Sequence, residues 1–186
     1  MDKLKTLLKK SNIDHSIEIL KENNLKTAHM YCKINNLSGQ ISGSLIEKFL
    51  QNKYNMSKNN ASKCIGDMNY LNDNIEIKIS LGGLRHNKFN YVQLRPNHNC
   101  NYLLTAYYVN DINYKDLGEL FIFYIHKTEM HNLISKFGSY AHGTISKFGK
   151  INIKDIIDPK NNKEYALRPR YNSKCWNELL KYRIFI

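Results

Sequence analysis

Residues 66–80 read GDMNYLNDNIEIKIS, and two short β-prone runs around a polar turn predict a β-hairpin. Asn72 and Asp73 both tolerate the positive φ that a two-residue turn requires. We therefore expect Leu71 to pair with Asn74 across this turn.

In that register Asp67 lies opposite Lys78, and Asn69 lies opposite Glu76. Side chains two residues apart share a face of a strand, so Asp67, Glu76 and Lys78 converge. Two close carboxylates repel unless a cation lies between them, and hard divalent metals prefer such oxygen ligands. The pattern favours a metal site with a lysine that can hold a phosphate or polarise a water, although an ordinary exposed hairpin also fits. The opposite face would carry the core side chains Ile75, Ile77 and Ile79.

A helix is predicted over residues 38–50, where the apolar side chains recur at helical spacing. Glu47 follows the candidate N-cap Ser44 by three residues, which is the spacing of a capping box. Glu47 therefore has two possible roles, as a helix cap or as a third carboxylate at the metal.

The order of these features resembles the PD-(D/E)xK nuclease superfamily, and most closely its type II restriction endonucleases. The resemblance covers residues 38–110 and rests on Glu47, Asp67 and the run Glu76-Ile77-Lys78. Gly66 stands where the family often has proline. The resemblance implies a restriction-endonuclease-like fold. It also implies a Mg²⁺-dependent, site-specific endodeoxyribonuclease that hydrolyses DNA phosphodiester bonds, or the cutting subunit of one.

The resemblance further implies a role for each matching residue. Asp67 and Glu76 would hold Mg²⁺ together with the Ile77 carbonyl, and Mn²⁺ would substitute for it. Lys78 would orient the attacking water or help to deprotonate it. Glu47 would bind a second metal or a metal-bound water.

The rest of the chain favours an α/β fold with a mixed central β-sheet flanked by helices. The apolar runs 102–109 and 120–125 indicate central strands with both faces covered. Helices are expected over 127–137 and 171–182, and a β-like segment near 151–157.

One nuclease domain is expected over residues 1–186. Residues 1–25 show two short amphipathic patterns, which predict helices packed on this domain or at an oligomer interface. No uninterrupted apolar run predicts a secretory leader or a membrane span. The four cysteines are widely spaced without a CxxC pair, which argues against zinc and favours a reducing cytoplasm.

The chain carries 28 Lys+Arg against 16 Asp+Glu, a formal net charge of +12. This excess favours double-stranded DNA as a partner, although a lysine bias from an AT-rich genome would explain part of it. Arg, Gln and Asn read base edges, whereas Lys and His mostly anchor phosphates. For Gln93 and Arg95 the alternative is a buried hydrogen-bonded pair that supports the active site. The candidate DNA-contacting residues are Arg85, His86, Asn87, Lys88, Gln93, Arg95, His142 and Thr144.

Cutting both strands of a short palindrome would require a homodimer, and a heterodimer with a larger recognition subunit is also compatible with this size. Two other functions fit the sequence. One is a non-catalytic basic nucleic-acid-binding module, for which 13 Tyr and 7 Phe could supply stacking surfaces. The other is a structure-specific, junction-resolving nuclease with the same active-site pattern.

Overall fold

The computed structural model describes residues 24–83 and 87–185, and a mixed six-stranded sheet forms its centre. The strand order is β1-β2-β3-β5-β6-β9, with β3 parallel to β5 and the other neighbouring pairs antiparallel. The predicted mixed central sheet is therefore confirmed. Its strands are β1 (Ser57–Lys58), β2 (Met68–Tyr70), β3 (Asp73–Gly83), β5 (Asn101–Val109), β6 (Glu119–Ile125) and β9 (Arg183–Ile184).

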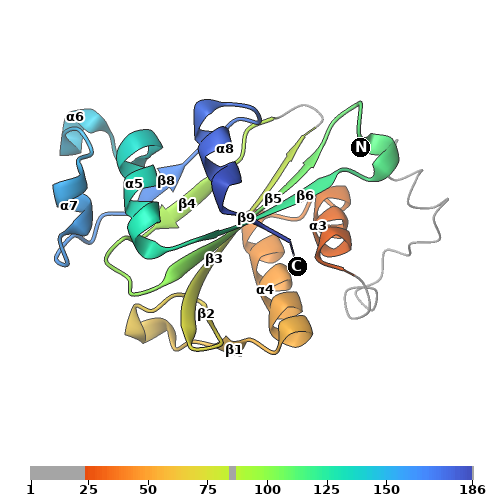
Figure 1. Ribbon diagram of the computed structural model, residues 1–186, viewed down its shortest axis with the longest axis horizontal. Coiled ribbons are helices and arrows are strands. Elements are labelled where there is room, and N and C mark those ends of the chain that lie inside the picture. Colours follow the sequence, from red (N-terminus) through yellow and green to blue (C-terminus); the bar gives the residue numbers. More distant parts are fainter. Residues whose placement is uncertain (1–23, 84–86, 186) are drawn as a thin grey trace.

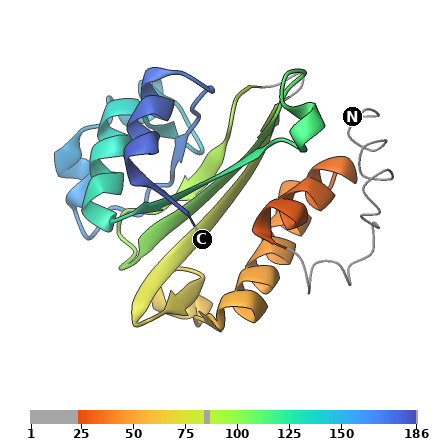
Figure 2. The same cartoon turned by 45° about the vertical axis from the view of Figure 1, so that its right-hand side comes forward.

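Helices cover both faces of this sheet, as Figures 1 and 2 show. Helices α3 (Leu25–Ile34) and α4 (Gly39–Tyr54) lie on one face. The other face is covered by two further helices and by a second sheet of order β4-β8-β7. The elements on or beyond that face are β4 (Tyr91–Leu94), α5 (Lys127–Phe137), β7 (Ser139–Tyr140), α6 (Ile145–Phe148), α7 (Ile153–Ile157), β8 (Tyr165–Leu167) and α8 (Lys174–Leu179). Short 3-10 turns complete the chain at Ala61–Lys63, Tyr114–Asp116 and Leu180–Tyr182.

Strand β5 is buried on both faces, as its continuous apolar sequence predicts. Tyr102 and Leu104 belong to the core that Trp176 of α8 shares with α5. Leu103 instead packs in the core beneath α3 and α4. Two cores on opposite faces explain why this run contains almost no polar residue.

The hairpin forms, but its turn lies one residue earlier than predicted. Met68 pairs with Ile75, so the turn residues are Leu71 and Asn72, both with positive φ (49° and 71°). Asp73 stays in β3 because the Tyr124 hydroxyl donates to its carboxylate at 2.7 Å. Moving the turn by one residue shifts the pairing by two, so every side chain keeps its expected face. Asp67 therefore lies opposite Glu76 on β3, and not opposite Lys78 as predicted.

Helix α4 begins earlier than the capping-box prediction requires. Its N-cap is Ser38, whose hydroxyl accepts from the Ile41 N–H at 3.3 Å. Ser44 lies inside the helix, so the capping role for Glu47 is wrong. The side chain of Glu47 is instead half-buried on the side of α4.

Two other predictions also meet the structure differently. The segment near 151–157 forms helix α7, not a strand, because Asn152 caps it by accepting from the Asp155 N–H at 3.0 Å. The helix over 127–137 is confirmed, and the terminal helix is shorter than expected, beginning at Lys174. Apart from its last two residues, the segment 1–25 lies outside the described residues. In the described part of the chain, no helix has the length and apolarity to cross a membrane.

Candidate active site

The site lies on an open edge of β3. Strand β2 pairs only with Asp73, Asn74 and Ile75, whereas β3 continues to Gly83. Beyond this pairing, a groove of about 680 Å³ follows the edge of β3 between the first half of α4 and strand β4. Glu47, Lys78 and Gln93 all line this groove.

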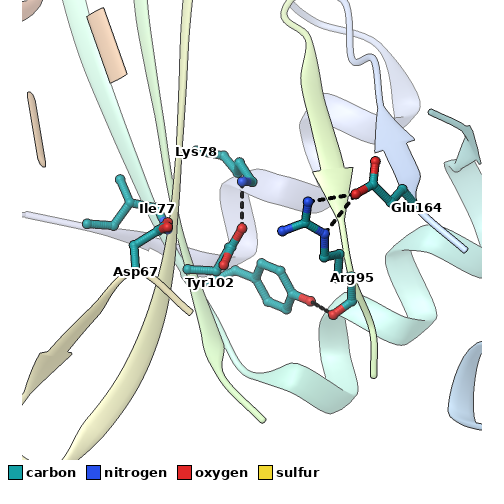
Figure 3. A network of polar contacts seen from close by, with 7 residues as sticks. Asp67, Ile77, Lys78, Arg95, Tyr102 and Glu164 are labelled. Carbon is teal, nitrogen blue, oxygen red and sulfur yellow. Dashed lines mark hydrogen bonds and ion pairs between the residues drawn. The ribbon is translucent and has the colours of Figure 1, made fainter. Parts of the chain in front are cut away.

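Asp67 directly precedes β2 and extends the hairpin contacts with its backbone and its side chain. Its N–H donates to the Ile75 carbonyl, and its Oδ2 accepts from the Ile77 N–H, both at 2.8 Å. In a strand the N–H and C=O of one residue point to the same side, so the Ile77 carbonyl also faces Asp67. Figure 3 shows Asp67 and Ile77 side by side.

Gly66 allows Asp67 to approach β3 this closely. Its φ is +83°, and a Cβ atom there would lie 2.7 Å from the Ile75 carbonyl carbon. Only glycine fits both the conformation and the space. Gly66 is thus a structural requirement of this hairpin.

Glu76 and Lys78 lie on the face of β3 opposite to Ile75 and Ile77, as predicted. Glu76 is only 4% exposed, and its Oε1 lies 2.5 Å from the Lys78 Nζ. Figure 3 shows Lys78 directed along the sheet face toward this carboxylate. A buried carboxylate is costly without a cation, and Lys78 supplies one.

Glu47 joins this group from the neighbouring helix. Burial raises the pKa of the Glu47 carboxyl, and the negative charge of Asp67 raises it further, while Lys58 and Lys78 oppose this. Glu76 raises this pKa as well. The structure therefore brings Glu47, Asp67, Glu76 and Lys78 into one electrostatic group.

A second set of metal-ligating groups also meets at Glu76. Ligand atoms of Glu76, His98 and Cys100 lie within 4.8 Å of one another and could hold a metal ion. Burial lowers the pKa of His98, although the charge of Glu76 opposes this shift. Sequence reasoning missed His98 and Cys100 because neither lies in a metal-binding motif. The one available signal was a His and a Cys two residues apart, directly before a buried strand.

The expected DNA-contacting residues fall into separate places. Gln93 is exposed at a bulge in β4, with a φ of +57°, and it lines the groove beside Lys78. Arg95 instead holds Glu164, with Nε at 2.8 Å and Nη2 at 2.7 Å from its Oε1 (Figure 3). His142 lies 3.5 Å from the other oxygen of Glu164. Arg95 and His142 thus share one carboxylate.

The remaining three described residues of this set are either exposed or bonded to the backbone. Asn87 and Lys88 are exposed, and the Asn87 carbonyl accepts from the Tyr171 N–H at 2.7 Å. Thr144 caps α6, its hydroxyl accepting from the Lys147 N–H at 3.3 Å. Arg85 and His86 lie outside the described residues.

Comparison with known proteins identifies no relative of this chain. Neither the family models, nor the curated proteins, nor the solved structures give a match to this chain. The function must therefore be argued from the geometry of the site.

Proposed function

We propose that this protein is a Mg²⁺-dependent endodeoxyribonuclease with a restriction-endonuclease-like active site. The observation that carries the proposal is the grouping of Glu47, Asp67, Glu76 and Lys78 at the open edge of β3, where Glu47 and Lys78 line the groove. Three carboxylates and one lysine in this order are what the resemblance to PD-(D/E)xK nucleases implies. The family assignment itself is part of the proposal.

The residues present fit a hard divalent cation. Asp67 and Glu76 would hold Mg²⁺ with the Ile77 carbonyl, and Mn²⁺ would substitute, since all these donors are oxygens. Burial raises the pKa of the Glu47 carboxyl, and the charges of Asp67 and Glu76 raise it further, as expected for carboxylates that lie near one another. Glu47 would take a second metal or a metal-bound water. When bound, Mg²⁺ would stabilise charge on the scissile phosphate and make a bound water more acidic.

The chain's own groups would position the reactants. Lys78, held against Glu76, would orient the attacking water and donate to a phosphate oxygen. The water oxygen would form a new bond to phosphorus as one P–O ester bond breaks, and the leaving oxygen would take a proton. Glu76 would keep Lys78 in place, because a fixed partner reduces the conformational freedom of this long side chain.

The substrate would be double-stranded DNA. The net charge of +12 favours a polyanion, and Lys48 and Lys58 line a second hollow of about 570 Å³ that shares Glu47 with the first. Gln93 would contact a base edge from the groove wall, as its exposure on the β4 bulge suggests. A homodimer, or a heterodimer with a larger recognition subunit, acting in the cytoplasm, completes the proposal.

A non-catalytic binding module has less support. Such a module would use exposed aromatic rings as stacking surfaces. Phe89 and Trp176 instead stack on each other in the core, with ring centroids 4.8 Å apart. Tyr108 likewise stacks on Tyr171, at 4.1 Å.

The direct test is to digest plasmid DNA with purified protein and Mg²⁺, and then to sequence the ends. The proposal expects discrete cuts that require Mg²⁺ or Mn²⁺, and loss of cutting in Asp67→Asn and Glu76→Gln. Asp111→Asn, an exposed acid outside the group, is the matched control and should cut normally. Cutting that survives Glu76→Gln, or that persists in EDTA, would contradict the proposal.

A further inference from the structure

Three potential metal ligands converge from the two parallel strands at the centre of the sheet. Glu76 comes from β3, Cys100 directly precedes β5, and His98 lies in the turn before it. The parallel register pairs Glu76 with Tyr102, so Cys100, two residues before Tyr102, lies on the same face of the sheet as Glu76. Their ligand atoms and that of His98 lie within 4.8 Å of one another.

The imidazole of His98 carries a ring nitrogen whose hydrogen bonding is not satisfied by the described residues. Its Nδ1 atom is buried and has no hydrogen-bond partner among the residues that the structure describes. Buried polar atoms without a partner are rare in folded proteins and need an explanation. A metal ion bound to a ring nitrogen would supply one.

The donor types decide which metal fits. One carboxylate, one imidazole and one thiolate match the borderline ions, whereas Mg²⁺ takes oxygen ligands and would not use Cys100. In a tetrahedral zinc site, ligand atoms are roughly 3.3–3.6 Å apart, so shifts of about 1 Å at each side chain would close the set. Three protein ligands leave the fourth position open.

We propose that Glu76, His98 and Cys100 form a binding site for Zn²⁺ or a similar transition-metal ion, with an open fourth position. This site is distinct in its donors from the all-oxygen site for Mg²⁺. Both sites use Glu76, whose Oε1 is already paired with Lys78. Zn²⁺ at this site draws Glu76 away from the oxygen site. On the basis of the proposed function, it therefore inhibits Mg²⁺-supported cleavage.

Binding is tested by titrating the metal-free full chain with Co²⁺, without DNA or Mg²⁺. The expected spectrum has a thiolate-to-cobalt charge-transfer band and intense visible bands of a tetrahedral ion, and Zn²⁺ removes both. Cys100→Ser should lose the charge-transfer band and weaken Co²⁺ binding at least about tenfold. Cys64→Ser and Cys175→Ser are matched controls, and each should keep the band. Cys64 is the exposed thiol, and Cys175 lies at the start of α8.

Because Cys100 is buried, Cys100→Ser could lose Co²⁺ binding by misfolding, so a second variant is needed. His98→Asn removes the imidazole from a turn that is partly exposed, and it should weaken Co²⁺ binding to a similar extent while the thermal melt stays cooperative. Bands that persist in Cys100→Ser, or that disappear in Cys64→Ser, would overturn the proposal in favour of adventitious binding at a surface thiol.

The inhibition is tested separately by adding Zn²⁺ to Mg²⁺-supported cleavage. The Zn²⁺ concentration that halves the rate should rise at least about tenfold in Cys100→Ser relative to the wild type. The cobalt titration needs no activity, so a protein that binds Co²⁺ as expected but never cuts DNA refutes the nuclease proposal alone. A protein that cuts DNA but shows no cobalt–thiolate band refutes the zinc site alone.

Discussion

The carboxylate of Asp67 accepts a hydrogen bond from the backbone N–H of Ile77 at 2.8 Å. A side chain thereby takes over where the backbone pairing of β2 with β3 ends. The same residue that extends the hairpin is a proposed metal ligand, so the strand pairing and the proposed chemistry depend on each other.

We predict that Gly66→Ala destabilises the protein by at least about 2 kcal/mol, because an L residue at positive φ is strained and the added methyl meets the β3 backbone. Thermal and urea unfolding measure the change. Gly39→Ala is the control, since a Cβ atom at this first residue of α4 meets nothing within 4 Å. Equal stability of the two variants would show that the backbone at Gly66 does not approach the Ile75 carbonyl this closely.

We predict that Lys78→Ala lowers the turnover of DNA cleavage at least about 100-fold, because the attacking water loses its oriented partner. DNA binding measured in Ca²⁺ should stay within a few-fold of the wild type, since other cations remain near the phosphates. Lys63→Ala, an exposed lysine outside the group, should cut at the normal rate. Wild-type cutting by Lys78→Ala would exclude this lysine from the reaction.

We predict that Mg²⁺ and Mn²⁺ support cleavage and that Ca²⁺ supports binding only. Ca²⁺ accepts the same carboxylate oxygens, but its longer and looser coordination positions an attacking water poorly. Gel shifts and single-turnover cleavage with each ion measure the two steps. Rapid cleavage in Ca²⁺ alone would require a different arrangement around Asp67 and Glu76.

We predict that Gln93→Ala reduces discrimination between cognate and random DNA by roughly 1–3 kcal/mol, the value of one bidentate base contact. Lys88→Ala should weaken both DNAs alike and flatten the salt dependence of binding, because this exposed lysine would contact a phosphate and not a base. Competition binding at several salt concentrations distinguishes the two. If Gln93→Ala weakens both DNAs equally, Gln93 contacts the backbone and not a base.

We predict a loss of stability between about pH 6.5 and pH 4 that originates at His29. Burial lowers the pKa of His29 to about 4, while its ring nitrogens contact the Leu25 carbonyl and the Thr105 hydroxyl, each at 2.7 Å. As the pH falls below the unfolded pKa of about 6.5, the unfolded chain takes a proton that the folded protein refuses, so folding becomes less favourable. The loss is about 1.4 kcal/mol per pH unit and roughly 3 kcal/mol in total.

Urea unfolding at a series of pH values measures this slope. His29→Gln should be less stable at neutral pH but should lack the slope from this group. His126→Gln, which changes an exposed histidine at the start of α5, should retain it. A wild-type protein whose stability is flat over this range would mean that His29 is not buried in its neutral form.

The sequence predicted those parts of the fold that depend on strong local patterns. Strands β5 and β6 and helix α5 follow from apolar runs whose length and period leave little choice. The turn of the hairpin was misplaced because the Tyr124 contact that holds Asp73 in β3 comes from a strand distant in sequence. The strand expected near 151–157 is a helix because its cap at Asn152 outweighs a short apolar run.

The same distinction separates the parts of the candidate site. Asp67, Glu76 and Lys78 share a face under any hairpin register of the same parity, so local periodicity was sufficient to group them. His98 and Cys100 reach Glu76 only through the parallel pairing of β3 with β5, which no local pattern encodes. The contact of Arg95 with Glu164 also joins segments far apart in sequence, and it was missed for the same reason.

The parallel pairing of β3 with β5 has a consequence for how the protein folds. Parallel neighbours cannot be joined by a tight turn, so the chain must make an excursion through β4 and the turn at His98 before β5 can align. Contacts that close such long loops form slowly, because the entropy of closure is lost before the contacts are gained. The two halves of the zinc site proposed above would meet only at that late step. Zn²⁺ bound at this site would stabilise contacts that form only after the rate-limiting step of folding. It would therefore act chiefly by slowing unfolding.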